Sequence, residues 1–441
     1  MITTINNKHN KLNVPNKQEQ NQTCLDSVER DGLSPKGNVP NLRFPEFQGE
    51  WEKCTFDKIA QYKKGPFGSA LKKDIFVPQS EDTIKVYEQQ NAIKKDWTLS
   101  RYYITKGYFN SHMKQFVAKA GDLIVSCAGT IGEIYELPQD AEEGVFNQAL
   151  MRVQVNDEAV NKEIFITVFS SMIDKFSKIY SNGSAIKNIP PFADLKKTQV
   201  FLPCKEEQKK IAKLLALLDE RIATQNKIID KLKSLIKGLN DSLYAQYGGK
   251  VLTSFAELGT SYSGLSGKSA QDFGSGKPFI TYLNVYSNNV INENEFQYVA
   301  IKDDEKQNVA EYGDVLFTLS SETPREVGIG SVYLGKEKVY LNSFCFGIHI
   351  TNMEVAFPPY LSYYVSSTAF RKFIYPYAQG STRFNLCKAD FEKASIKLPT
   401  LENQKRIYSI LSHIDSKIET EIQMLNLYNS QKRYLLRQMF I

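Results

Sequence analysis

Apolar residues recur at alternating spacings of three and four in two long stretches of the chain, residues 203–246 and 399–439. In the first stretch the pattern runs through Ile211, Leu215, Leu218, Ile222, Ile229 and Leu232. In the second it runs through Ile407, Leu411, Ile414, Ile418 and Leu425. Such spacing places apolar side chains on one stripe of a helix and is typical of a coiled-coil seam. The pattern predicts two helices, each roughly 60 Å long.

The second stretch repeats the first without a gap, at a constant offset of 196 residues that aligns Pro203 with Pro399. Each seam is interrupted at the same place by one polar residue, Gln225 in the first stretch and Glu421 in the second. A lone polar residue in a seam commonly fixes register and partner choice. We therefore expect the two helices to pair with each other in one alignment. The alternative is two ordinary long surface helices.

The regions before the two helices also match each other. GDLIVSCAGTIGEIYEL (121–137) corresponds to GDVLFTLSSETPREVGIGSVYL (313–334), and GVFNQALMRVQV (144–155) to VYLNSFCFGIHI (339–350). These stretches favour buried or half-buried strands, and the segments after them have helical spacing. Matching framework residues at offsets of 192–199 are Gly65/Gly264, Gly121/Gly313, Asp122/Asp314, Asn147/Asn342, Gly183/Gly380, Ser184/Ser381, Asn188/Asn385 and Asp194/Asp390. The predicted fold class is α/β, with two pseudo-repeated domains of mixed sheet and helices.

Five segments follow from this pattern. Residues 1–40 are polar, lack aromatic residues and should be disordered, because they have too few apolar anchors to offset the entropy of ordering. Residues 41–201 should form the first domain and residues 202–247 the first long helix. Residues 248–397 should form the second domain, and residues 398–441 the second long helix.

Composition narrows the class only a little. The net charge of +6 is compatible with a polyanionic partner without establishing one. The six cysteines form no CxxC pair and the four histidines are scattered, so we expect neither a zinc site nor a disulfide framework. No apolar run is long enough to span a bilayer and no secretion signal is visible, so we expect a cytoplasmic protein.

Catalytic motifs are missing from the sequence. GLSGKS (264–269) resembles part of a phosphate-binding loop, but Tyr262 stands where that loop needs its first glycine, and a turn is the better interpretation. NQAL (147–150) lacks the form of an amino-methyltransferase site. FPPY (357–360) has phenylalanine in place of the essential polar residue and is better explained as a helix N-terminus. We predict a non-catalytic chain that binds no cofactor or metal itself.

The loops of both domains combine amide, basic and aromatic side chains, which suit phosphate contacts and base edges in DNA. In the first domain the candidate DNA contacts are Lys63, Lys64, Phe67, Ser69, Lys72, Lys73, Tyr87, Gln89, Gln90, Asn91, Ser184 and Lys187. In the second they are Tyr262, Ser266, Lys268, Tyr282, Asn284, Tyr286, Asn288, Thr323, Arg325, Ser381, Arg383 and Asn385. Any one of them taken alone is more often a solvated surface residue.

The layout from residue 41 onward resembles the specificity subunit of type I restriction-modification systems. The resemblance rests on LRFPEFQGEWE, on GDLIVS and GDVLFT, and on GSAIKN and GSTRFN before the helices. LPCKEEQKKIAKLLALLDERI and LPTLENQKRIYSILSHIDSKI, which open the helices, are its most specific motif, although Asn403 departs from it where the first copy has Glu207.

The resemblance implies two target recognition domains, each reading half of a split site in double-stranded DNA, and an antiparallel coiled coil whose length sets the unread spacer. It also implies two methyltransferase subunits docked on the chain, with restriction and motor subunits joining them. Those partners would use S-adenosylmethionine, ATP and Mg. The alternative from another class is a non-catalytic scaffold that binds protein partners through its two repeated domains.

Overall fold

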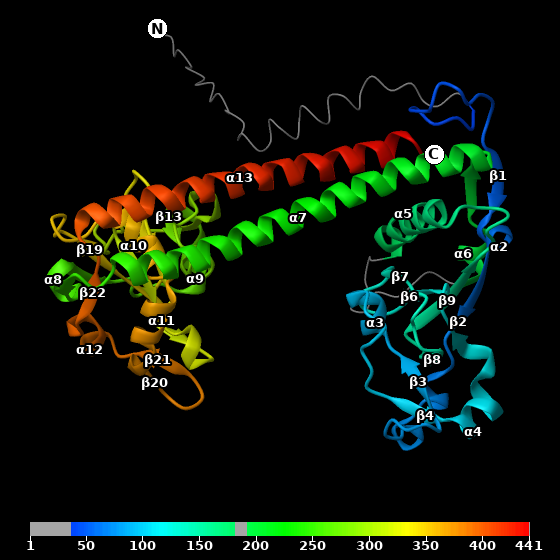
Figure 1. The fold of residues 1–441 in the computed structure, drawn as a ribbon, viewed down its shortest axis with the longest axis horizontal. Helices are drawn as coiled ribbons and strands as arrows, with labels where there is room; N and C mark the ends of the chain where they lie inside the picture. The colour runs from blue at the N-terminus through cyan, green and yellow to red at the C-terminus, as the bar shows by residue number, and fades with distance from the viewer. Residues whose placement is uncertain (1–36, 181–191, 441) are drawn as a thin grey trace, which may run out of the picture. The chain divides into compact units, whose positions relative to one another are not determined.

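The computed structural model describes residues 37–180 and 192–440. The chain forms two compact units, one of Met1–Glu220 with Asn429–Ile441 and one of Arg221–Tyr428. The division cuts through both long helices, α7 (Lys205–Tyr247) and α13 (Leu401–Gln438), so each unit contains a part of each helix (Figure 1).

The described residues of the first unit form three sheets. The smallest pairs β1 (Glu52–Thr55) with β10 (Gln199–Leu202). An antiparallel sheet has the order β2 (Ala60–Lys64), β9 (Leu150–Val155), β6 (Leu123–Ser126) and β7 (Ile134–Glu136). A third has the order β4 (Tyr103–Thr105), β3 (Thr83–Tyr87), β8 (Gly144–Phe146) and β5 (Val117–Ala118), with β3 and β8 parallel. The helices of this unit besides the long ones are α2 (Phe56–Ile59), α3 (Gln89–Lys94), α4 (Lys106–Tyr108), α5 (Lys162–Tyr180) and α6 (Phe192–Lys197).

The second unit repeats these sheets in the same strand order, except that its third sheet has three strands and no counterpart of β5. They are β11 (Val251–Thr253) with β22 (Ile396–Leu398); β12 (Gly259–Ser263), β19 (Cys345–Ile350), β15 (Val315–Thr318) and β17 (Gly330–Val332); and β14 (Gln297–Val299), β13 (Phe273–Ile280) and β18 (Tyr340–Leu341). A further sheet joins β16 (Ser320–Ser321), β21 (Phe384–Leu386) and β20 (Ala378–Gln379). Its helices are α8 (Phe255–Leu258), α9 (Tyr282–Ser287), α10 (Pro358–Tyr364), α11 (Thr368–Ile374) and α12 (Lys388–Lys393). The predicted α/β pseudo-repeat is confirmed.

The repeated Gly-Asp pair is a turn in both units. Gly121 and Gly313 have φ of 84° and 91°, which glycine adopts without the steric cost that other residues bear. One carboxylate oxygen of the following aspartate accepts a hydrogen bond from the backbone three residues earlier, at 3.0 Å for Asp122 and 2.8 Å for Asp314. The motif therefore fixes the entry into the central strands β6 and β15.

Gly65 and Gly264 match for a different reason. A Cβ atom at Gly65 would lie 1.9 Å from the carbonyl oxygen of Asn147, and one at Gly264 would lie 2.1 Å from that of Asn342. The asparagine side chains accept hydrogen bonds from the backbone two residues ahead, at 3.0 and 2.9 Å. The pairs therefore form one close backbone crossing that occurs in both units. Asn147 is a turn residue, which explains NQAL without a catalytic role.

The two long helices pair antiparallel. In the second unit the guanidinium of Arg221 lies 6.0 Å from the ring centroid of Tyr428, while Gln225 contacts Glu421. Residue numbers that increase along α7 are thus paired with residue numbers that decrease along α13. In the first unit Lys432 forms an ion pair with Asp219. The antiparallel coiled coil is confirmed.

Both long helices begin with the same buried glutamine. The Gln208 amide donates to the Pro203 carbonyl at 2.9 Å and accepts from the Asn161 backbone at 2.7 Å. Gln404 repeats this with Pro399 at 2.9 Å and Phe357 at 2.8 Å. Because both ends of each buried amide are bonded, the glutamine anchors the helix start to its unit. Phe357 precedes α10, whose first turn carries the prolines of FPPY as predicted.

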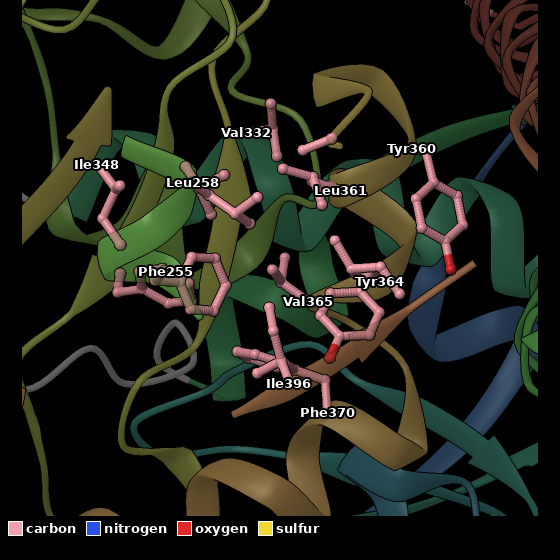
Figure 2. Close-up of a cluster of buried hydrophobic side chains, with 14 of the residues drawn as sticks. Phe255, Leu258, Val332, Ile348, Tyr360, Leu361, Tyr364, Val365, Phe370 and Ile396 are labelled. Atoms are coloured by element: carbon pink, nitrogen blue, oxygen red, sulfur yellow. The ribbon is translucent and has the colours of Figure 1, made fainter. Parts of the chain in front are cut away.

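Four residues assigned to the seam are also domain core residues. Ile211 and Leu215 pack in the core cluster of the first unit with Met439, and Ile407 and Leu411 pack in that of the second unit with Leu243. Figure 2 shows part of the second core, where Phe255 and Leu258 of α8 lie near Ile348 and Val365. The start of each long helix therefore packs against its own unit and against the end of the other long helix.

Candidate nucleic-acid interface

The strand pair β16 and β21 gathers several candidate side chains of the second unit. The Tyr282 hydroxyl donates to the Ser320 carbonyl at 2.8 Å, and the Arg383 guanidinium donates to the Ser320 hydroxyl at 3.3 Å. Asn385, which is exposed, pairs with Ser320 in the strand ladder. The structure thus brings Tyr282 of α9, which lies 101 residues before Arg383 in the chain, to the small sheet beside Arg383 and Asn385.

The loop after β16 adds more polar groups to this patch. The Glu326 carboxylate accepts from the Thr323 hydroxyl and the Tyr286 hydroxyl, both at 2.9 Å, and these hydrogen bonds lower the pKa of Glu326. Arg325 in the same loop is exposed. The patch therefore presents two exposed arginines, Arg325 and Arg383, beside tyrosine and threonine hydroxyls, a combination suited to phosphates and base edges.

Two residues of the patch had no sequence signal. The Arg371 guanidinium donates to the carbonyls of Gly328, Arg325 and Val327 at 2.7–2.8 Å and so holds the loop, and burial lowers its pKa. Phe344 is 56% exposed with the Arg383 guanidinium 5.9 Å from its ring centroid. Backbone carbonyls are not visible as partners in a sequence, and an exposed phenylalanine looks like any strand residue.

Ser266 and Lys268 belong to a different loop contact. The Ser266 backbone exchanges two hydrogen bonds with the Gln307 amide, at 3.0 and 2.8 Å. Lys268 forms an ion pair with Glu305 and donates to the Ala300 carbonyl at 2.7 Å, and its side chain is only 7% exposed. The hydrogen bond from Lys268 is the largest of several effects that lower the pKa of Glu305 to about 2. Lys268 therefore stabilises a turn, and the prediction that it contacts DNA is not supported, since its charge is already neutralised.

Five candidates of the first unit lie in or next to the loop that follows β2. Lys64, Phe67, Ser69, Lys72 and Lys73 are exposed. Lys63 is half-buried, and its ammonium donates to Gln115 at 2.8 Å beside the Phe116 ring. Gln90 is exposed, whereas the Gln89 amide donates to the Thr130 carbonyl at 2.9 Å and to that of Ala128. Gln89 thereby ties α3 to the loop after β6, as Tyr282 ties α9 to the loop after β15.

Four candidates are core residues, and the structure does not support their contact with DNA. Tyr87 and Asn284 are 0% exposed, Asn91 is 2% exposed and Tyr262 is 7% exposed. The two asparagine amides hold the segments after α3 and α9: Asn91 donates to the Asp96 and Leu99 carbonyls, and Asn284 donates to that of Asn292. Asn91 and Asn284 occupy equivalent positions in the two copies of the repeat, and this match is the sequence signal that indicates a framework role.

The side chains of Tyr262 and Asn288 also form hydrogen bonds within the second unit. The Tyr262 hydroxyl donates to Asp314 at 2.7 Å, and its ring stacks on His349 at 4.3 Å. Burial raises the pKa of Asp314, to which His349 Nδ1 is bonded at 2.9 Å. The Asn288 amide donates to Asn284 and Glu295, all at 3.1 Å. A base would have to displace these bonds to reach either side chain.

The loop GSTRFN (380–385) forms the turn between β20 and β21, with Gly380 at φ 142°. Its Ser381 is exposed. The matching loop GSAIKN, with Ser184 and Lys187, lies outside the described residues, as do residues 1–36 of the predicted disordered segment.

The first unit has a groove of about 1160 Å³ lined by α5, β10 and the paired ends of α7 and α13. Thr167 of α5 and Asp219 of α7 both line it. At the corresponding place in the second unit, the larger Tyr363 donates a hydrogen bond to Asp415. The groove thus coincides with a tyrosine-to-threonine difference between the repeats.

Across residues 37–180 and 192–440, no group of three or more His, Cys, Asp and Glu side chains is arranged to hold a metal ion. No helix in that part of the chain is long and apolar enough to cross a bilayer.

Comparison with known proteins defines the family. Residues 48–234 and 261–427 match the family described as the type I restriction modification DNA specificity domain. A Methanocaldococcus jannaschii protein named as the specificity subunit of the type I restriction enzyme MjaX is 30% identical over 419 residues, covering 82% of this chain and 92% of that protein. The MjaVIII specificity subunit of the same organism is 23% identical over 212 residues, covering 46% and 44%.

A solved structure supports the fold. It is described as concerning complex assembly and conformational transition of the type I R-M system, and it matches with a TM-score of 0.56 at 15% identity. The match covers 88% of this chain and 96% of that chain. The chain belongs to the type I restriction-modification DNA specificity family. Each matched range covers most of one copy of the repeated domain and part of the long helix that follows it.

Proposed function

We propose that the chain selects the DNA target of a type I restriction-modification complex, with residues 41–201 and 248–397 each reading one half of a bipartite site. One observation carries the proposal: the two units share sheets, turns and helix anchors but differ in their loop side chains. Phe67 in the first unit corresponds to Ser266 in the second, and Gln89 corresponds to Tyr282. A shared scaffold with different loops suits two domains that read different sequences.

The helix pair has two proposed roles. Its length sets the number of unread base pairs between the half-sites, and it docks two methyltransferase subunits, to which restriction and motor subunits are added. In this proposal S-adenosylmethionine, ATP and Mg act in those partners, and the chain itself is non-catalytic. The fixed contact of Gln225 with Glu421 supports a helix pair of defined register.

The proposal is tested by replacing residues 51–201 with the corresponding domain of another family member. Methylation in the resulting strain should change in one half of the bipartite motif and keep the other half and the spacer. A change in both halves would show that the domains do not read independently.

A scaffold that binds proteins through both domains is the competing function. Salt dependence separates the two, because lysine and arginine contacts with phosphates release counterions and weaken steeply as salt rises. Exposed Lys64, Lys72, Lys73, Arg325 and Arg383 favour DNA. Between 50 and 200 mM salt, a protein that binds DNA through phosphate contacts loses orders of magnitude in affinity. If the affinity of the complex for its duplex hardly changes over this range, the scaffold is favoured.

A further inference from the structure

Phe67 is 89% exposed, the highest exposure among the exposed large apolar side chains of the described residues. It stands at the tip of the loop that follows β2, between the exposed Lys64 and Lys72. A phenylalanine side chain that is almost fully exposed adds little to the stability of the folded state, because apolar side chains stabilise a fold only when they are buried. Its position needs another explanation.

The loop holds Phe67 outward on a fixed backbone. Before it, Gly65 crosses against Asn147 with its amide bonded to the Leu150 carbonyl at 2.9 Å, and Pro66 is buried. After it, the Ala70 amide returns a hydrogen bond to the Phe67 carbonyl at 2.9 Å, and the Tyr108 hydroxyl binds the Ala70 carbonyl at 2.8 Å. The loop is anchored on both sides, so the backbone at Phe67 is already ordered before binding. Little conformational entropy is therefore lost when a partner covers the Phe67 ring.

The second unit builds the same loop with a different tip. Gly264 makes the same backbone crossing, and Leu265 is 3% exposed where Pro66 is buried. The exposed tip residue is Ser266. The backbone before the tip is therefore shared, whereas the tip residue is apolar in one domain and polar in the other.

The surrounding charges point to DNA as the surface that covers Phe67. Lys64, Lys72 and Lys73 are exposed around it, with Asp74 as the neighbouring carboxylate. Lysines that hold phosphates on either side would bring the ring to the base edges. In the major groove the apolar group that base pairs present is the 5-methyl of thymine, and phenylalanine is among the side chains that contact it.

We propose that Phe67 contacts the 5-methyl group of a thymine in the half-site read by the first domain and thereby determines that base. The inference rests on the proposed function, since it assumes that this domain reads DNA. Ser266 gives the second domain no such contact, so thymine selection by this loop belongs to the first half-site alone.

The test uses the complete complex of this chain with its cognate methyltransferase subunits, and a duplex carrying its methylated motif. The domain replacement described above identifies the first half-site. Each thymine in that half is replaced in turn by uracil, which removes only the methyl group and keeps base pairing. Binding of the native complex and of a Phe67→Ala complex is measured on every duplex, with Tyr312→Ala, which removes an exposed aromatic in the second unit, as the control.

One thymine should be sensitive. Uracil there should weaken native binding by about 5-fold, the low end of the cost of one mismatched base pair. Phe67→Ala should weaken binding to the thymine duplex by a similar factor and remove the difference between thymine and uracil, while Tyr312→Ala leaves that difference unchanged. This is a double-mutant cycle between a side chain and a methyl group.

The inference would be overturned by a first half-site without thymine, by no effect of uracil at any position, or by an effect of uracil that persists in Phe67→Ala. Equal loss of affinity on all duplexes in Phe67→Ala would instead indicate a ring inserted between base pairs, and would also overturn it. If the native complex methylates a bipartite motif and one of these results is found, only this inference fails. If it methylates no such motif, the proposed function fails.

Discussion

Gln225 on α7 donates a hydrogen bond from its side-chain amide to the backbone carbonyl of Glu421 on α13, at 3.1 Å, and a second to the Glu421 carboxylate. Gln225 is 7% exposed, so its amide has few alternative partners. The two residues occupy equivalent positions of the repeat, 196 residues apart. The sequence pattern predicted that the helices pair in one alignment, and the structure shows that in this alignment the two equivalent polar residues meet.

Replacing Gln225 with leucine should lower the unfolding midpoint of the second unit by about 2–4 °C, because a hydrogen bond to a charged group is lost. The double change of Gln225 and Glu421 to leucine should recover or exceed the native midpoint, since leucines complete the apolar seam. Thermal unfolding measures both. Asn226→Leu is the matched control, because the Asn226 amide bonds only its own helix, to the Ile222 carbonyl. Equal effects of the Gln225 and Asn226 changes would contradict this account.

Glu207 on α7 is fully buried and forms a double hydrogen bond with Arg43, at 2.7 Å from each of its two oxygens. The hydrogen bond raises the pKa of Arg43. Arg43→Met should lower the free energy of unfolding of the first unit by about 3–5 kcal/mol, because it leaves a buried carboxylate unpaired. Arg43→Lys should recover only part, since lysine cannot make the paired contact. Denaturant titration gives the values.

A matched double variant tests the same pair. The second copy has Asn403 where the first has Glu207, so Arg43→Met combined with Glu207→Asn removes the charge as well as its partner. It should be more stable than Arg43→Met alone. If the two variants are equally unstable, the loss comes from Arg43 packing and not from the unpaired charge.

Burial raises the pKa of Asp314 in the folded state above its unfolded value of about 3.9. The folded state then binds more protons than the unfolded state between those two values, so this group's contribution to stability is present below about pH 4 and is lost as pH rises through the folded pKa. Asp314→Asn should keep the bonds from Tyr262 and the Glu311 backbone and remove this pH dependence. The difference in unfolding free energy between native and variant, followed from pH 4 upward, should therefore change in favour of the variant. A difference that stays constant with pH would contradict the prediction.

Deleting seven residues from each long helix preserves the heptad pattern and shortens the helix pair by about 10 Å. At about 3.4 Å per base pair this corresponds to about three base pairs. The methylated motif should lose about three base pairs of spacer and keep both half-sites. Changed half-sites with the original spacer would contradict the proposal that the length of the helix pair sets the spacer.

The sequence predicted the repeat and the helix pair because these depend on periodic patterns and on residues that match at equivalent positions. It assigned Tyr87, Asn91, Tyr262 and Asn284 to DNA, whereas the structure places them in the core. Amide and aromatic side chains look the same in a sequence whether they face a base or a backbone carbonyl. Only the packing around them decides between the two.

Other parts of the site had no sequence signal at all. The partners of Arg371 are three backbone carbonyls, which every residue has, and the position of Arg383 over Phe344 depends on a turn that brings β21 beside β16. Lys268 is the opposite case. It looked free in GLSGKS but pairs with Glu305, which lies 37 residues further along the chain. Long-range pairing of this kind follows from the tertiary structure and not from local composition.

The most direct measurement is the methylome of a strain with this gene intact and with it deleted, in the presence of the cognate methyltransferase subunit. The account predicts that deletion removes one bipartite methyladenine motif and leaves all other methylation in place. That result would supply both half-sites and the spacer together. An unchanged methylome in a strain whose methyltransferase is active would contradict target selection by this chain and favour a protein-binding scaffold.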